Sequence, residues 1–183
     1  MAAQATIHRF VIQLSDVDRQ VYEALDLRVA RHPSESLRYL LTRTLAYALS
    51  YEEGIAFSKG GLSQAEEAPV AIRDATGVLK AWIDVGMPSA DRLHKASKAA
   101  GRVAIFTHAE VAALRREASS RAIHKVEAIE VWRIGVALLD ALEGKVDRTT
   151  TMDLLRNDGK LYVTVDGETL EGDISQVSLV EPP

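Results

Sequence analysis

The sequence predicts a mixed fold of helices and strands, of the α/β or α+β class. Three observations predict it: apolar residues recur at period two near the start, helical spacing follows, and strand-like and helical segments then alternate. The chain has 183 residues, of which 47% are hydrophobic and 26% charged. This length and composition favour one compact domain, residues 1–183.

The first two strand-like segments are IHRFVIQL (7–14) and VYEALDLRVA (21–30), the second with apolar residues at odd positions. We expect them to form an N-terminal β-hairpin with its turn around residues 15–19. A helical stripe of leucine, alanine and threonine follows from Leu37 to Leu49. Pro33 is placed to open this helix and Gly54 to close it.

The rest of the chain alternates short strands with helices, separated by turn residues. We expect a strand at 55–58, a loop at 60–69 (GGLSQAEEAP), and strands at 70–73 and 78–85 joined by the DATG turn. A helix at 88–100, a strand at 102–108 and a helix at about 109–121 follow, and then the segment AIEVWRI (128–134) and a short helix at 135–144. The C-terminal strands are expected at 151–155, 160–165 and 173–180, separated by the NDG and DGE turns.

Composition excludes several classes of function. Lys plus Arg number 22 against 26 Asp plus Glu, so the net charge of −4 lacks the overall basic character of strong DNA binders. Cysteine is absent, which rules out disulfides and thiolate metal sites. The five histidines have no paired metal spacing, and neither a GxSxG elbow nor a phosphate loop occurs. No run of about 20 apolar residues occurs, so we expect a cytoplasmic protein without a membrane partner.

Three acidic residues are candidates for a metal site. Asp74 in the DATG turn and Asp84 near the end of the 78–85 strand would supply carboxylate oxygens from rigid elements, as a hard divalent cation requires. Glu35, in the expected first turn of the Pro33 helix, lies on the flank of the apolar stripe and can face a cleft edge.

Basic residues follow Asp84 on the next helix. Arg92, Lys95 and Lys98 recur every three residues, and Arg102 follows at the helix exit. Positive charge at this place suits phosphate, because phosphoryl transfer develops negative charge on the nonbridging oxygens. Lys95 could lean back toward Asp84.

Structural roles also explain each of these residues. Asp74 is a favoured first residue of a turn, and Asp84 could cap the following helix or face water. Glu35 would favour a helix macrodipole without any chemistry. Lys95 and its neighbours are typical of a solvated helix face.

Several short segments occur in order along nearly the whole chain: ARHPSE, LAYAL, WIDVGMP followed by RLHKAS, VAIFTH, DRTTTMDLL and the NDG turn. Together they resemble the YaeQ family of small bacterial proteins. This resemblance implies a compact variant of the PD-(D/E)XK, restriction-endonuclease-like fold, whose core has the order αβββαβ. The order of elements expected from residue 33 onward is similar to that core.

The resemblance also implies roles for the candidate residues. It makes Glu35 the acid of the first helix, Asp74 the acid of the hairpin and Asp84 the acid of the third strand, gathered around Mg²⁺ or Mn²⁺. The sequence departs from the superfamily pattern twice: Gly86 stands where the lysine is expected, and Val70 follows Pro69 where an acid is expected.

The leading hypothesis is therefore a magnesium-dependent nuclease acting on nucleic-acid phosphodiesters. Asp74, Asp84 and Glu35 would hold the metal and Lys95 would polarise the attacking water, while Arg92, Lys98 and Arg102 would bind the substrate. The alternative is a catalytically inactive module of the same fold that binds nucleic acid or a protein partner, favoured by Gly86 and the net negative charge.

Overall fold

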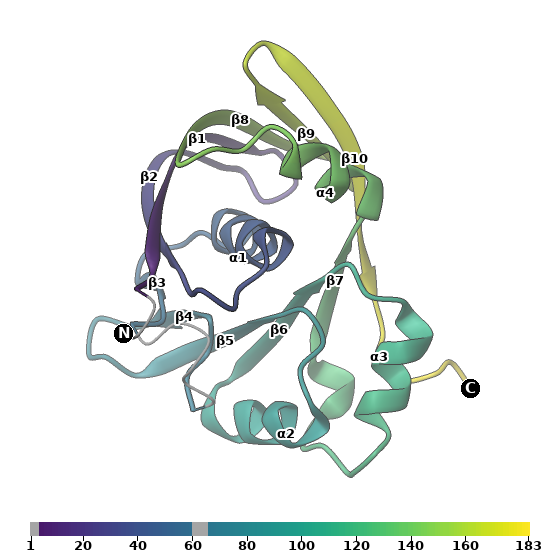
Figure 1. Cartoon of the computed structure of the whole chain (residues 1–183). Coiled ribbons are helices and arrows are strands. Elements are labelled where there is room, and N and C mark those ends of the chain that lie inside the picture. The colour runs from purple at the N-terminus through teal and green to yellow at the C-terminus, as the bar shows by residue number, and fades with distance from the viewer. Residues whose placement is uncertain (1–3, 60–65) are drawn as a thin grey trace. The chain divides into compact units, whose positions relative to one another are not determined.

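A computed structural model describes residues 4–59 and 66–183 of the chain (Figure 1). It contains two compact units, the first built from residues up to Tyr51 with Ile134–Ile174, the second from Glu52–Arg133 with Ser175–Pro183. One domain over residues 1–183 stays a prediction. Most of the predicted 60–69 loop lies outside the described residues. None of the helices in the described part is both long and apolar enough to cross a membrane.

The sheet of the first unit has the strand order β2-β1-β8-β9-β10. β1 pairs with β8 in parallel and with β2 antiparallel, and the pairs β8–β9 and β9–β10 are antiparallel. The predicted N-terminal hairpin and C-terminal antiparallel strands are thus confirmed, but the last strand begins at Glu168 and ends at Val177 instead of covering 173–180. The strands are β1 (Thr6–Asp16), β2 (Val21–Arg31), β8 (Thr149–Asn157), β9 (Lys160–Val165) and β10 (Glu168–Val177).

The two tight turns of this sheet follow from Asp-Gly pairs. Asp158 and Gly159 have φ of 50° and 72°, and Asp166 and Gly167 have φ of 52° and 78°. Two successive residues with positive φ form the hairpin turn whose twist matches that of the flanking strands. The predicted NDG and DGE turns are therefore confirmed.

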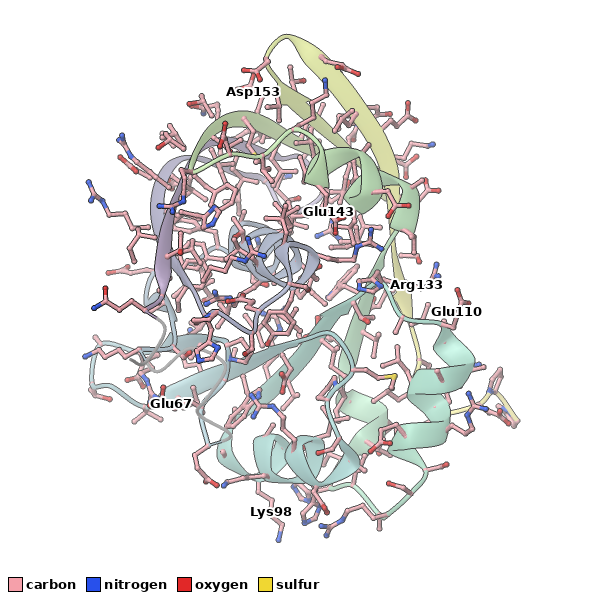
Figure 2. All side chains as sticks on the ribbon, in the orientation of Figure 1. Glu67, Lys98, Glu110, Arg133, Glu143 and Asp153 are labelled. Atoms are coloured by element: carbon pink, nitrogen blue, oxygen red, sulfur yellow. The ribbon has the colours of Figure 1, made fainter. Side chains whose placement is uncertain are left out.

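Helices α1 (Leu37–Leu49) and α4 (Val136–Glu143) complete the first unit (Figure 1). Arg38 of α1 forms ion pairs with Asp140 and Glu143 of α4, and Glu143 is labelled in Figure 2. Their apolar sides join the inward-facing strand residues in the core. Fully buried side chains of this core include Phe10, Ile12, Leu14, Leu40, Leu41, Leu45, Leu138 and Leu139.

The predicted ends of the first helix are wrong at both termini. Ser36 caps the helix, because its hydroxyl oxygen accepts a hydrogen bond from the backbone N–H of Tyr39, 3.1 Å away. Pro33 lies in the preceding turn. The helix ends at Leu49, well before Gly54, which has φ of 93° and leads into the next strand.

The sheet of the second unit has the order β3-β4-β5-β6-β7. β3, β4 and β5 are successively antiparallel, whereas β5, β6 and β7 are parallel. The order α1, β3, β4, β5, α2, β6 is the one predicted from residue 33 onward. The elements are β3 (Ile55–Phe57), β4 (Val70–Arg73), β5 (Leu79–Val85), α2 (Ala90–Ala99), β6 (Arg102–Thr107), α3 (Val111–Ala118), the 3-10 turn Val126–Ala128 and β7 (Glu130–Ile134).

Helices α2 and α3 pack on one face of this sheet (Figure 1). The strand side chains Trp82, Ile105 and Val131 meet Leu93 of α2 and Leu114 of α3 in one apolar cluster. Because side chains alternate along a strand, Asp84 lies on the same face as Trp82. The last residues of β5 therefore place an acid beneath the start of α2, as the sequence predicted.

Candidate functional site

Asp84 is buried at the carboxyl end of β5, with 2% of its surface exposed. Its Oδ2 accepts hydrogen bonds from Nε of Arg92 at 2.7 Å and from Nε1 of Trp82 at 3.0 Å, and Oδ1 accepts one from the Val85 N–H at 3.2 Å. Arg92 also donates to the backbone carbonyl of Glu67 and lies 5.3 Å from the centroid of the Trp82 ring. Arg92 thus neutralises the acid and ties residue 67 to α2.

Lys95 does not reach Asp84, contrary to the prediction. Its ammonium group forms an ion pair with Glu66, and both side chains are largely exposed. Arg92 lies in the first turn of α2, next to the end of β5, whereas Lys95 lies almost one turn further along the helix. The residue that meets the acid is therefore Arg92, which the sequence had placed among substrate-binding residues.

Asp74 is an exposed turn residue at the far end of the same hairpin. Its Oδ1 accepts hydrogen bonds from the hydroxyl and the N–H of Thr76 and from the N–H of Val78, at 2.6, 2.9 and 3.0 Å. The Thr76 hydroxyl is the main cause, and the Val78 N–H the next, of a pKa lower than the ordinary value of an aspartate. The turn chemistry predicted as its structural role is present.

The predicted meeting of Asp74 with Asp84 does not occur. In the β4–β5 ladder Arg73 lies opposite Leu79 and Val70 lies opposite Ile83. Asp74 therefore follows the end of β4 that adjoins the start of β5, and the five-residue step from Leu79 to Asp84 spans roughly 17 Å. Asp74 lies beside the start of β5 and Asp84 lies near the end of β5. Carboxylates this far apart cannot bind a single ion.

Glu35 belongs to the first unit and precedes α1 instead of lying in its first turn. Arg43 donates to it through Nε and Nη2, both at 3.1 Å, and the His32 N–H donates to Oε2 at 3.1 Å. The Glu35 side chain is fully buried and that of Arg43 is 4% exposed. Its carboxylate closes the 32–35 turn against α1, and its role as a metal ligand stays a prediction.

The residues around Asp84 do not fit a magnesium ion. Such an ion needs several anionic or carbonyl oxygens, whereas the one buried carboxylate of Asp84 already accepts three N–H hydrogen bonds and is paired with Arg92. Buried Val70 stands across the hairpin where the sequence resemblance implies an acid, and Gly86, whose N–H donates to the Phe106 carbonyl, stands where it implies a lysine. Among residues 4–59 and 66–183, no three acidic or histidine side chains gather as metal ligands.

The predicted basic residues have different environments. Arg102 forms an ion pair with Glu130 at 2.5 Å, and Arg92 is engaged at Asp84. Lys98 is exposed near the end of α2 and points away from the unit, as Figure 2 shows. Further positive charge comes from Arg121.

Sequence reasoning missed Arg121 and the histidines at 94 and 124. A charge count would have indicated the basic segment 90–125, which contains all three. This segment carries eight Lys or Arg and three Asp or Glu, a net charge of +5 in a chain of net charge −4.

The fold and the site define a mixed α+β protein in which a strand-end carboxylate is neutralised by an arginine from the following helix. Residues 1–174 match the family model described as YaeQ protein. The chain is 30% identical over 173 residues to the YaeQ protein of Escherichia coli (strain K12), covering 93% of this chain and 94% of that protein. The chain belongs to the YaeQ family.

Two solved structures of the same family share its fold. The crystal structure of YaeQ protein from Pseudomonas syringae has a TM-score of 0.84 at 28% identity and covers 95% of this chain and 96% of its own. The crystal structure of YaeQ protein from Xanthomonas axonopodis pv. citri has a TM-score of 0.85 at 27% identity, with coverages of 95% and 98%.

Proposed function

We propose that this chain is a nucleic-acid-binding module that does not cut its ligand, built on a PD-(D/E)XK-type core. The order α1, β3, β4, β5, α2, β6 supports such a core, because it is the αβββαβ order that the sequence resemblance implies. The position of Asp84 at the end of the third of these strands also agrees with it.

The observation that carries the proposal is that the carboxylate of Asp84 is buried and hydrogen-bonded on both oxygens. A catalytic carboxylate must offer an oxygen lone pair to a metal ion or to water. Here Arg92, Trp82 and the Val85 N–H supply donors to both oxygens, and the acid is buried. With Val70 and Gly86 at the neighbouring motif positions, the geometry favours binding over hydrolysis.

The nature of the ligand follows from charge asymmetry. Residues 90–125 carry a net charge of +5, so the remainder of the chain carries −9. Lys95, Lys98 and Arg121, all within this segment, are exposed. Arg92, Lys95 and Arg102 pair with acids outside this segment, and its cations still outnumber the acids within it and those three partners. Such an excess attracts phosphate locally, because the nearby field and not the total charge governs the contact.

Fluorescence anisotropy with labelled DNA and RNA of about 20 nucleotides, at low salt, tests the proposal. The expected result is binding that weakens steeply as salt rises, with the oligonucleotides intact after incubation with Mg²⁺ or Mn²⁺. Absence of binding to every probe would overturn the proposal, and cleavage that Asp84→Ala abolishes would replace it with a nuclease.

A Mg²⁺- or Mn²⁺-dependent nuclease is the second candidate function. The αβββαβ order and the placement of Asp84 at the end of β5 favour it. Hydrolysis would require the carboxylate of Asp84 to be released from Arg92. Isothermal titration calorimetry with Mg²⁺ and Mn²⁺ tests this candidate: a metal affinity lost in Asp84→Ala supports it, and absence of binding opposes it.

A further inference from the structure

His94 links α2 to the connection that follows α3. The backbone N–H of His124 donates a hydrogen bond to Nδ1 of His94 at a distance of 3.1 Å. A ring nitrogen that accepts this bond carries no proton, so the proton of the neutral imidazole is on Nε2. The half-buried ring of His94 therefore keeps its only N–H for a further acceptor.

Positive charge surrounds this ring. Partial burial is the first cause of a lowered His94 pKa, followed by the charges of Arg121 and Lys98 and then of His124, with Asp91 acting in the opposite sense. Asp91 forms an ion pair with Arg121 at 2.5 Å. Arg121, Lys98 and His124 are exposed. Asp91 is thus the one acid among these groups, and the others are the cations Arg121 and Lys98 and the titratable His124.

We propose, on the basis of the proposed function, that His94, Lys98, Arg121 and His124 form the phosphate-binding surface of this protein. In this His94 cluster, the Nε2–H of His94 donates to a nonbridging phosphate oxygen of the nucleic-acid backbone. Lys98 and Arg121 bind the same or adjacent phosphates by charge, because both are exposed beside the ring and belong to the positively charged segment 90–125.

The composition of this surface indicates backbone contacts without base recognition. The one Phe, Tyr or Trp residue between residues 90 and 125 is Phe106, which is buried in β6. Bases therefore find no exposed aromatic ring of these types to stack on in this segment. Binding through phosphates alone depends little on sequence and strongly on salt, since each neutralised phosphate releases counterions.

Charge reversal at two positions tests the surface. We expect Lys98→Glu/Arg121→Glu to weaken binding of a labelled duplex about tenfold or more at low salt and to lower the salt slope by about two. Arg28→Glu is the control, because Arg28 is exposed on β2 of the first unit and its reversal changes the charge as much as one of the two substitutions does. Circular dichroism checks that all variants fold.

His94→Asn tests the hydrogen bond separately. The Asn side-chain oxygen can still accept from the His124 N–H, whereas the donor at Nε2 is lost. We expect a loss of affinity of roughly threefold to tenfold, the usual contribution of one hydrogen bond.

The outcomes separate the surface from the proposed function. If the unmodified protein binds no nucleic acid, the proposed function fails and the surface with it. If it binds and the double variant binds equally well, the surface is wrong while the function stands. An equal loss in Arg28→Glu would overturn the surface too. If a polyglutamate peptide competes as well as the duplex does, the surface recognises acidic protein in place of nucleic acid.

Discussion

The guanidinium of Arg92 and the carboxylate of Asp84 form an ion pair in which the acid is 3% and the base 20% exposed. The two residues are eight positions apart and meet because the chain turns directly from β5 into α2. This short connection makes the pair a local consequence of the strand-to-helix unit. It also means that the charge of this candidate metal ligand is balanced within the chain.

Replacing Arg92 by alanine should destabilise the fold by about 2–4 kcal/mol, because it leaves a buried carboxylate without its cation. Urea unfolding followed by circular dichroism measures the change. Arg102→Ala is the control, since Arg102 and Glu130 are more than a quarter exposed and such a pair contributes about 1 kcal/mol or less. A change in Arg92→Ala no larger than in the control would show that Asp84 does not depend on Arg92.

The arrangement of elements could largely be predicted from the sequence because it depends on local periodicity. Apolar strand-like segments identified β1 and β5, alternation at period two identified β2, and the Asp-Gly pairs identified the turns around β9. Helix ends were less predictable. Pro33 and Gly54 were predicted to bound α1. The helix instead begins after Ser36, whose side chain caps it. Whether a nearby serine or proline starts a helix depends on local backbone geometry, which the sequence pattern does not give.

The partners of the candidate residues could not be predicted, because they depend on tertiary contacts. The sequence placed Asp84 correctly on the face of Trp82, but which of Arg92 and Lys95 reaches that acid depends on how α2 packs over β5. The separation of Asp74 from Asp84, in contrast, could have been predicted from the sequence. In the antiparallel β4–β5 hairpin, Asp74 lies at the turn and Asp84 lies at the other end of β5.

Glu35→Ala should cost about 3–5 kcal/mol of folding free energy, because it leaves the buried guanidinium of Arg43 unpaired. Glu35→Gln preserves the shape and the acceptor for the His32 N–H, so it should cost less. Urea unfolding compares the two variants. If both were as stable as the unmodified protein and a Mg²⁺ affinity disappeared, Glu35 would be a metal ligand and not a structural residue.

Gly54→Ala should destabilise the protein far more than Gly77→Ala. Both glycines have positive φ, 93° and 87°, so both substitutions strain the backbone by about 1–2 kcal/mol. At Gly54 the new Cβ would lie 2.0 Å from the backbone carbonyl oxygen of Arg73, whereas at Gly77 no atom lies within 4 Å. Overpacking adds roughly 1–3 kcal/mol at Gly54 alone. Equal thermal midpoints in the two variants would contradict this contact.

Asp18 should stabilise the first unit in a pH-dependent way. Its oxygens accept from the N–H groups of Asp158 and Gly159 in the β8–β9 turn, and the Asp158 bond is the first cause of its lowered pKa. A lowered pKa gives stability that is complete above the unfolded value of about 3.9 and is lost as pH falls through the folded value. The stability difference from Asp18→Asn should therefore shrink on acidification. Unfolding curves at several pH values measure it, and a constant difference would contradict the prediction.

The imidazole of His94 should titrate below its ordinary pKa of about 6.5 in the free protein, because its ring is partly buried and faces Arg121 and Lys98. Since the folded pKa is depressed, neutral His94 contributes stability above the unfolded value that is lost as pH falls. NMR titration of the ring protons measures the midpoint, and His94→Asn assigns the signal. Lys98→Glu should raise the midpoint by removing a like charge, and a bound oligonucleotide should raise it further in the unmodified protein. A midpoint unchanged by saturating oligonucleotide would place the phosphates away from this ring.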